Sequence, residues 1–574
     1  MALFQHLPEE ILLDILVSLQ IHDLLACCAT CKSFQHLLKH SALLQLIVEL
    51  AVQGLRLRTH INVRDDDGSS VDILNAFMRS QRAWKKIEPF KTATVPMSRV
   101  EYEICDRIFA HGLANDEDDF RGFEFNDLKI NCKTVTRSIL TWKRIEDTGI
   151  DILDYSFDVA NDLVVIVEDP DTNMIQGPNR VFLVTISDGR PHPQAATTCF
   201  SFIEPQYWDH CDIKIVDDYL AILFREGSHF SDSEGTLMIW NWKTGAAYYD
   251  RTGIGGYAFL SPDTLFLVVA ILDQHHGITA GIELLHLGKP KSDVFLALPF
   301  SKFPFEITVL SDKPTVDSPT IPKNAPLSPF VIEETTERII VIQSEKSLLF
   351  IACRPLLRIL LDESIKPTSK KPSKLPYKRV FKWHQWGPDN TLWLRMWGLW
   401  PGFTAVSGAR FCSMMNSSQQ LFFTNKDIAD GDKKKGLPES KAKEDEDEDE
   451  LDSLAVGIRS ELTDTEEDEG RSILILDFNP RPILRSASKR EEVGAPDNTD
   501  NGEDNWWKRF RKHTKTAKLS SEFTKLNQSK VGKLPFRAYQ RPMQRRYTDM
   551  IITIDHILGI VEGETGYDVL QFVE

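Results

Sequence analysis

Apolar residues recur every three or four positions in the first fifty residues, a spacing that predicts helices. The first predicted helix covers residues 9–20. The second covers residues 24–39 and begins after Asp23, a good N-cap residue. The third covers residues 42–53 and begins after Ser41. The apolar face of the first helix comprises Ile11, Leu12, Ile15, Leu16 and Leu19.

These helices carry more apolar surface than they can bury among themselves. Of the first 52 residues, 32 are apolar, against 42% of the whole chain. A surface helix needs apolar residues along only one stripe, and a unit of about 50 residues leaves much of its surface exposed. The excess must therefore pack against the remainder of this chain or against another protein, and the pattern leaves both alternatives open.

After one more predicted helix over residues 71–87, the pattern changes to short apolar runs separated by Asp, Gly and Pro, which predicts β-strands. Strand pairs recur at intervals of 46 to 56 residues, a period typical of propeller blades. We therefore expect a multidomain α+β protein, in which all-α helices precede a large all-β region, a β-propeller of six to eight blades. A pair of β-sandwiches is the alternative. The strand pairs begin near residues 163 and 181, 219 and 236, and 265 and 282.

Composition shifts divide the chain into seven parts. Residues 426–470 are acidic and lack aromatic residues, and residues 485–533 are polar and basic, so both are expected to be disordered inserts. The final strands are expected to close the ring against the first blade, because closure removes exposed strand edges. The predicted parts are N-terminal helices (1–54), a helical linker (55–94), blades (95–425), an acidic insert (426–470), a strand (471–484), a basic insert (485–533) and final strands (534–574).

Charge is distributed unevenly along the 574 residues. The net charge is −17, but residues 439–469 alone contribute 15 Asp and Glu against three Lys and Arg. Neither nucleic-acid binding nor membrane binding is expected from this balance. The basic stretch Lys508–Lys518 is compatible with a nuclear-import signal, a docking motif or a solvated loop.

The sequence indicates a cytoplasmic or nuclear protein. It contains no apolar run of about 18 residues, so no membrane-spanning helix is expected. The first ten residues lack the pattern of a secretory signal. Nine scattered cysteines indicate reduced thiols. Cys28, Cys31, His36 and His40 follow zinc-finger order, but their middle spacer is too short to bring them around one ion.

The first forty residues resemble the F-box, which runs Leu-Pro-x-Glu-hydrophobic, Ile-Leu, Asp-Leu-Leu and Cys-x-x-Phe/Trp. This chain departs from the usual pattern at Ala29-Thr30 before Cys31, and in having Phe34 instead of Trp. The chain looks like a set of fungal, mostly basidiomycete, F-box proteins. The corresponding residues are Leu7-Pro8-Glu9-Glu10-Ile11, Ile15-Leu16, Asp23-Leu24-Leu25, and Cys31 with Phe34.

The resemblance implies that these helices bind the Skp-type adaptor of an SCF (Skp-cullin-F-box) ubiquitin ligase, and through it cullin. The expected adaptor-binding residues are Leu7, Pro8, Ile11, Ile15, Leu16, Leu19, Leu24, Cys31 and Phe34.

The region Leu237–Gly245 resembles the end of a WD repeat, with Asn241 where Asp is usual, so a degenerate WD-like propeller is implied. Five tryptophans between Trp383 and Trp400 are expected either in the core or on a binding surface.

Signature motifs for nucleotide binding, zinc proteases and serine hydrolases are missing from the sequence. We therefore expect no catalytic residues, metal or cofactor, and a non-catalytic substrate receptor whose propeller binds an unknown target protein for ubiquitin-dependent degradation. Two alternatives stay open. One is an F-box-containing interaction scaffold without a ligase role. The other is an enzyme, which would need His and carboxylate side chains clustered at the propeller axis.

Overall fold

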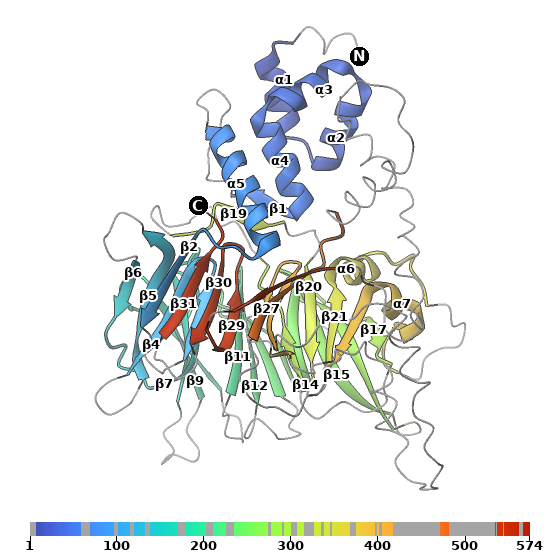
Figure 1. The fold of residues 1–574 in the computed structure, drawn as a ribbon. Coiled ribbons are helices and arrows are strands. Elements are labelled where there is room, and N and C mark those ends of the chain that lie inside the picture. Colours follow the sequence, from blue (N-terminus) through green and yellow to red (C-terminus); the bar gives the residue numbers. More distant parts are fainter. Residues whose placement is uncertain are drawn as a thin grey trace, which may run out of the picture.

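Seven helices and the strands of a ring make up the described part of the chain (Figure 1). The helices are α1 (Glu9–Val17), α2 (Ile21–Thr30), α3 (Lys32–His40), α4 (Ala42–Gln53), α5 (Ser69–Lys86), α6 (Cys353–Leu361) and α7 (Trp383–Asn390). The computed structural model describes residues 7–58, 69–96, 101–114, 120–131, 138–169, 179–202, 210–225, 235–273, 277–289, 292–299, 307–314, 326–333, 338–344, 347–367, 375–395, 399–400, 405–416, 471–481, 534, 536–543, 545–561 and 566–573.

The predicted helix over residues 24–39 is wrong, because the chain breaks at Cys31 into α2 and α3. Cys31 has an extended backbone, with φ −148° and ψ 157°. In a single straight helix, Leu24 and Leu37 would lie more than 15 Å apart along the axis. The break lets Leu24 on α2 and Leu37 on α3 enter the same small core. Tertiary packing therefore overrides local helix propensity here.

The predicted helix over 42–53 is confirmed as α4, whereas the first predicted helix ends at Val17 rather than at residue 20, and α2 begins at Ile21, before the predicted N-cap Asp23. Local capping explains where α4 begins and ends. The Ser41 side chain accepts a hydrogen bond from the backbone N of Leu44 at 3.2 Å, as an N-cap does. Gly54 ends α4 with φ 72°, a conformation that glycine adopts without steric penalty. The predicted helix over 71–87 corresponds to α5.

The strands form six sheets around one ring and one two-stranded pair beneath the helices. The pair is β1 (Leu55–Leu57) with β19 (Phe330–Ile332). The sheet strands from the first part of the chain are β2 (Lys91–Pro96), β3 (Tyr102–Cys105), β4 (Ile108–Ala114), β5 (Phe120–Asn131), β6 (Ser138–Ile145), β7 (Ile152–Asp158), β8 (Leu163–Glu168), β9 (Asn179–Thr185), β10 (Cys199–Phe202), β11 (His210–Val216), β12 (Tyr219–Arg225), β13 (Gly235–Asn241) and β14 (Ala247–Ser261). Those from the second part are β15 (Thr264–Asp273), β16 (Gly277–His286), β17 (Val294–Ala297), β18 (Thr308–Leu310), β20 (Ile339–Gln343), β21 (Ser347–Ala352), β22 (Arg379–Phe381), β23 (Thr391–Arg395), β24 (Leu399–Trp400), β25 (Val406–Ser407), β26 (Arg410–Asn416), β27 (Arg471–Asp477), β28 (Arg537–Pro542), β29 (Tyr547–Ile552), β30 (His556–Val561) and β31 (Gly566–Gln571).

The long strand β14 joins two blades into the eight-stranded sheet. Its first part, up to Arg251, pairs with β13, and its second part, from Ile254, pairs with β15. Divided at this point, the described strands group into seven blades. In chain order these are β29-β30-β31-β2, β3–β6, β7–β10, β11 to early β14, late β14 to β17 with β22, β18-β20-β21-β23, and β24–β28.

The seven blades, numbered 1 to 7 in that order, lie around a closed ring. Innermost strands of neighbouring blades contact one another, as for β3 with β7, β7 with β11, β14 with β18, and β26 with β29. The predicted propeller is confirmed, with a blade number inside the predicted range, and the paired β-sandwich alternative is wrong. The predicted strand pairs correspond to β8–β9, β12–β13 and β15–β16.

Blade 1 closes the ring by joining the two ends of the propeller. The N-terminal strand β2 pairs antiparallel with the C-terminal strand β31, from Lys91 opposite Gln571 to Pro96 opposite Gly566. The predicted boundary between linker and propeller, after residue 94, falls inside β2. Closure of this kind leaves the ring without a free edge between first and last blade.

Blade 7 carries both predicted inserts, which lie outside the described residues. The ends of one undescribed segment, Asn416 and Arg471, pair with each other at the end of the blade farther from the helices. The other segment follows Arg481, next to Asn479, whose side chain donates to the carbonyl of Val52 on α4 at 2.9 Å. Asn416 and Arg471 therefore lie at one face of the ring, and Arg481 lies at the other.

Three of the five clustered tryptophans belong to the core. Trp383 and Trp386 lie on α7 and Trp393 lies on β23, and all three are buried in one apolar cluster between blades 5 and 6. Trp397 and the side chain of Trp400 lie outside the described residues.

Candidate adaptor-docking surface on the N-terminal helices

The first four helices share a small core of their own. Its members come from all four helices, so α1, α2 and α3 are held by α4 and by one another. The Ser18 hydroxyl donates to the carbonyl of Ile15 at 2.7 Å and ends α1. The buried members are Leu12, Leu16, Leu24, Cys28, Leu37, Leu38, Leu44 and Val48.

A second cluster attaches α4 and α5 to the propeller. Leu46 and Leu50 of α4 pack with Phe77 of α5, and with Phe330 and Ile332 of β19. On α5, the ring of Trp84 stacks on Phe572 next to β31 with centroids 4.1 Å apart. The helices thus pack partly against this chain's own propeller, which was one of the two alternatives for their excess apolar surface.

The second alternative, packing against another protein, applies to α1–α3, because these three helices stand clear of the propeller (Figure 1). Ile11 is 46% exposed and Val17 is 36% exposed, and both lie on α1. Other apolar side chains of the first three helices and their flanking residues are half-buried and pack against the core of the helices. These are Leu7, Leu13, Leu19, Ile21, Leu25, Cys27 and Phe34.

The nine residues expected to bind the adaptor fall into three groups by exposure. Pro8 and Ile11 are exposed, whereas Leu16 and Leu24 are 2% and 0% exposed. Burial removes Leu16 and Leu24 from the surface, so they support the helices from within. The remaining five are half-buried: Leu7, Ile15, Leu19, Cys31 and Phe34.

Val17 and Leu13 were not in the expected set, and they lie on the side of α1 away from Ile11 and Ile15. The sequence did contain a signal for them, because α1 has apolar residues around its whole circumference, and one stripe is enough for a helix that packs on one side. Residues on the second side therefore need another partner.

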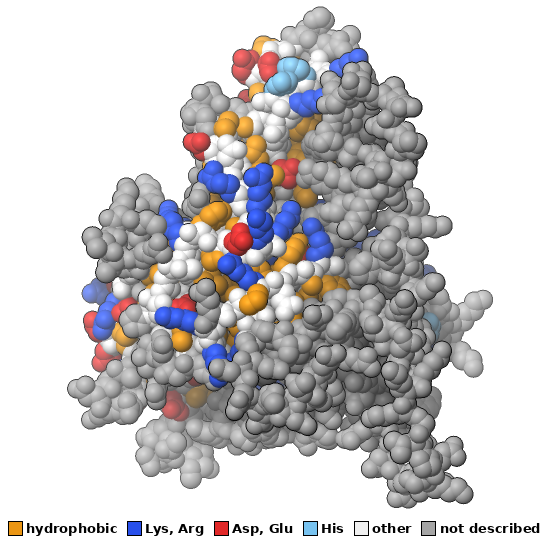
Figure 2. All heavy atoms as spheres, in the orientation of Figure 1, with side chains coloured by type: hydrophobic (Ala, Val, Ile, Leu, Met, Phe, Trp, Pro, Cys, Tyr) orange, Lys and Arg blue, Asp and Glu red, His pale blue; other side chains and the backbone are white. Residues whose placement is uncertain are grey.

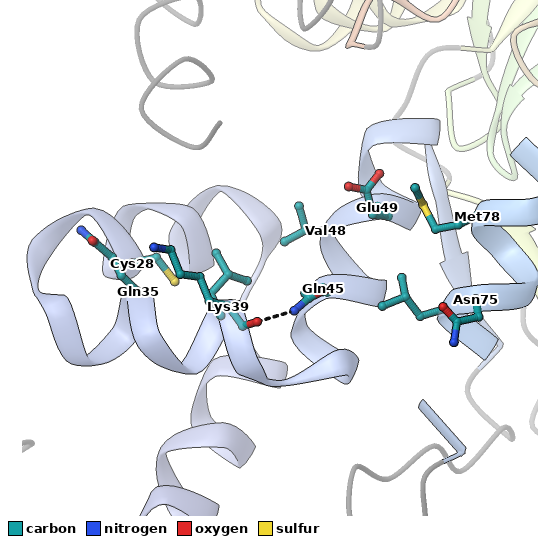
Figure 3. Close-up of a pocket in the computed structure, with 10 residues that line it drawn as sticks. Cys28, Gln35, Lys39, Gln45, Val48, Glu49, Asn75 and Met78 are labelled. Atoms are coloured by element: carbon teal, nitrogen blue, oxygen red, sulfur yellow. Dashed lines mark hydrogen bonds between the residues drawn. The ribbon is translucent and has the colours of Figure 1, made fainter. Parts of the chain in front are cut away.

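A groove of about 370 Å³ lies between α3 and α4 on one side and α5 on the other (Figure 3). Its lining mixes apolar groups with the side chains of Gln35, Lys39, Glu49 and Asn75. Between α3 and α4 the Gln45 amide donates to the Lys39 carbonyl at 2.6 Å.

The buried Cys28 thiol is not a reactive group. Burial raises the pKa of the Cys28 thiol to about 11, and the neighbouring Cys27 and Cys31 add to the effect. The thiol therefore stays protonated at neutral pH. Within the described ranges, no three His, Cys, Asp or Glu side chains are arranged to hold a metal ion.

Charged side chains gather on the innermost strands of the propeller, where two lysines lie next to carboxylates. Burial and the charges of Glu101, Glu103 and Asp212 raise the pKa of Asp154 well above its ordinary value. Lys214 Nζ lies 3.4 Å from Asp212 Oδ2, and Lys313 Nζ lies 3.7 Å from Glu103 Oε1 and 2.8 Å from Ser156 Oγ. Burial raises the pKa of Glu103, and Lys313 opposes this. No histidine is among the described members of this cluster, so it differs from the His-carboxylate arrangement that an enzyme at the axis would need.

Comparison with known proteins decides the assignment of the helices. Residues 4–45 match the family model described as F-box-like. The N-terminal segment is F-box-like. It precedes a β-propeller, a combination typical of non-catalytic adaptors, and F-box domains generally bind Skp-type adaptors. No curated protein sequence matches the chain, and none of the described helices is long and apolar enough to cross a membrane.

Solved structures resemble this chain only distantly. The WD40 domain of SCAP from fission yeast matches with a TM-score of 0.34 and 8% identity, over 84% of this chain and 97% of that chain. Oligopeptidase B from Leishmania major matches with a TM-score of 0.28 and 12% identity, over 63% of this chain and 46% of that chain. The propeller is assigned here from the strand pairing of this chain itself.

Proposed function

We propose that this chain is the substrate-recognition subunit of an SCF-type ubiquitin ligase in the cytoplasm or nucleus. In this proposal the F-box-like helices bind a Skp-type adaptor and, through it, cullin, while the propeller binds the target protein. The chain supplies proximity and performs no chemistry itself, because holding two partners together replaces a bimolecular encounter.

The exposed apolar surface of α1 carries the proposal. Ile11 and Val17 remain partly in water although the propeller of the same chain is available below, and other apolar side chains of the helices are half-buried. Burying an Ile or Val side chain contributes about 1.5–3 kcal/mol. A partner that covers this surface therefore gains affinity from several side chains at once.

The direct test is co-purification of the tagged full chain with a recombinant Skp-type adaptor. Ile11→Glu should weaken the complex at least tenfold, because a charge replaces an apolar contact at the interface. Val71→Glu on α5 is a matched control, since Val71 is also 46% exposed but lies on another helix. Equal binding by both variants and the unmodified chain would count against the proposal.

A second measurement separates a ligase subunit from a scaffold. Proteins that co-purify with the unmodified chain are followed in cells that express Ile11→Glu. If the chain directs degradation, these proteins should accumulate and their half-lives should lengthen. Unchanged half-lives together with lost adaptor binding would favour the scaffold alternative.

A further inference from the structure

A basic surface runs along α5 and the outer strand of blade 7. Figure 2 shows Lys and Arg side chains gathered where the helices meet the propeller. The helix α5 packs against β28, and the Arg541 guanidinium donates to the carbonyl of Ile87 at 2.6 Å just after the helix ends. The exposed or half-buried basic residues of this surface are Arg79, Arg82, Lys85, Lys86, Arg537 and Arg541.

A small opening lies within this surface, between α5 and blade 7. It is lined by Trp84 and Lys85 from α5, Arg410 from β26, and Arg537 and Tyr539 from β28. The Arg410 guanidinium lies over the Trp84 ring, 4.7 Å from its centroid. The volume of about 10 Å³ accommodates roughly one oxygen-sized group.

Positive charge in this opening exceeds negative charge. Asp477 is the one carboxylate among its lining residues, which also include Lys85, Arg410 and Arg537. The Arg537 Nε atom is buried and has no hydrogen-bond partner among the described residues. Burial lowers the pKa of Arg410 and the Arg537 charge adds to this effect, whereas Asp477 and Tyr539 oppose it. An oxyanion bound in the opening would reduce the repulsion between Arg410 and Arg537 and would accept a hydrogen bond from Arg537 Nε.

The chain carries a matching anion close by. Residues 439–469 hold 15 acidic against three basic residues, including an unbroken acidic run from Glu444 to Glu450. The segment rejoins blade 7 at Arg471, and Asp477 at the far end of the same strand pairs with Arg537. The opening is therefore about 20 Å from that point. Glu450 precedes Arg471 by 21 positions, and a chain of that length can span up to about 70 Å.

We propose that the acidic run Glu444–Glu450 binds the basic surface of α5 and β28 in the free chain, with one carboxylate in the opening between Lys85, Arg410 and Arg537. Tethering favours this occupant over an acidic segment of another protein, because a group held within reach acts at high effective concentration. The binding does not depend on the proposed ligase role.

Zero-length carbodiimide cross-linking of the full chain tests the contact, since it joins carboxylates to lysine amines that touch. At low salt, Lys85 or Lys86 should be linked to residues 444–450, and about 1 M salt should abolish the links by shortening the Debye length to roughly 3 Å. Lys378, whose side chain is 78% exposed on blade 5, is the reference lysine. Links spread equally to Lys378, or confined to lysines 508–518, would overturn the proposal.

A binding measurement supplies an independent test. The seven acidic residues 444–450 are replaced by Asn and Gln in the full chain, and a labelled synthetic peptide of residues 439–469 is added. The peptide should bind this variant at least tenfold more tightly than the unmodified chain, and Arg537→Gln should remove most of the gain. Arg144→Gln on blade 2 is the control and should leave binding unchanged, since the Arg144 side chain is 48% exposed, pairs with Glu124 and does not line the opening. Equal peptide binding with and without the acidic run would overturn the proposal.

Discussion

Arg338 donates a hydrogen bond from Nε to Oδ1 of Asp312 at 2.9 Å, and Arg338 is only 2% exposed. Its Nη1 donates to the carbonyls of Phe259 and Leu260 in β14, at 3.2 and 3.3 Å. The other carboxylate oxygen of Asp312 accepts from the backbone N of Gly408 at 2.6 Å. One buried ion pair therefore connects blades 5, 6 and 7.

Arg338→Met is expected to lower the free energy of unfolding by about 3–5 kcal/mol, because it leaves the Asp312 carboxylate buried without its partner. Denaturant unfolding of the full chain measures the change. Arg180→Met is the control: this arginine pairs with Glu168 at 2.5 Å, but its side chain is 49% exposed, so the loss should stay below about 1 kcal/mol. Similar losses in both variants would contradict the assigned role of the buried pair.

Asp568 should be important for closing the ring. It lies on β31, is 8% exposed, and accepts hydrogen bonds from Thr94 Oγ1 on β2 at 2.6 Å and from Tyr547 OH on β29 at 2.9 Å. Asp568→Ala leaves two donors without an acceptor and should reduce stability by about 1–3 kcal/mol. Limited proteolysis should then cut first in β31. Asp250→Ala, at an exposed position of β14, should change neither measurement.

Asp555 and His556 give the fold two opposing pH dependences. Burial raises the pKa of Asp555 to about 7, and the charge of Asp106 adds to the effect. The folded state therefore keeps the Asp555 proton between about pH 4 and 7, and stability falls as the pH rises through that window. Burial lowers the pKa of His556 to about 3. The unfolded state alone binds that proton below about pH 6.5, so stability falls as the pH drops toward 3.

Single substitutions should separate these two effects. His556→Gln removes the histidine contribution, so its thermal midpoint should fall steadily from pH 4 to 7. Asp555→Asn removes the carboxyl contribution, so its midpoint should rise from pH 4 to 6.5 and then level off. Thermal unfolding at half-unit pH steps measures both, and identical slopes in the two variants would rule out this assignment.

Leu24 should contribute to the stability of the N-terminal helices, whereas Ile11 should contribute to adaptor binding. Leu24 is 0% exposed within the core of the helices, and Ile11 is 46% exposed. Leu24→Ala should destabilise α1–α3 by about 2–5 kcal/mol, and faster amide hydrogen exchange in α2 would report it. Ile11→Glu should change exchange little, within about 0.5 kcal/mol. Faster exchange in both variants would mean that adaptor-binding losses reflect unfolding.

The strands that the sequence predicted best are those buried on both faces. Runs such as Leu163–Glu168 in β8 and Thr264–Asp273 in β15 are almost uninterrupted apolar stretches, so their type and pairing follow from the pattern. The sequence pattern does not predict the strand pairing of blade 2, because polar residues interrupt its strands, as in Phe120–Asn131. The division of β14 between two blades depends on tertiary pairing alone and has no local signal.

At the candidate site, the motif predicted which helices are involved but not which side chains reach the surface. Leu16 and Leu24 match the F-box pattern as well as Ile11 does, yet they are buried. The difference arises from the core shared by α1–α4, which includes Leu16 and Leu24 but not Ile11. The cluster of basic residues around Asp477 could not be predicted from the sequence either, because its members come from α5, β26 and β28, which are far apart along the chain.

The helix α4 belongs to two apolar clusters at once, with Leu44 and Val48 facing α1–α3, and Leu46 and Leu50 facing the propeller side. Its 12 residues rise about 18 Å. Each residue also turns the helix by about 100°. Inserting one alanine in the middle of α4 would therefore rotate α1–α3, and any protein bound to them, by about 100° about the axis of α4 relative to the propeller. The length of α4 therefore sets both the distance of α1–α3 from the propeller and their rotation about the axis of α4.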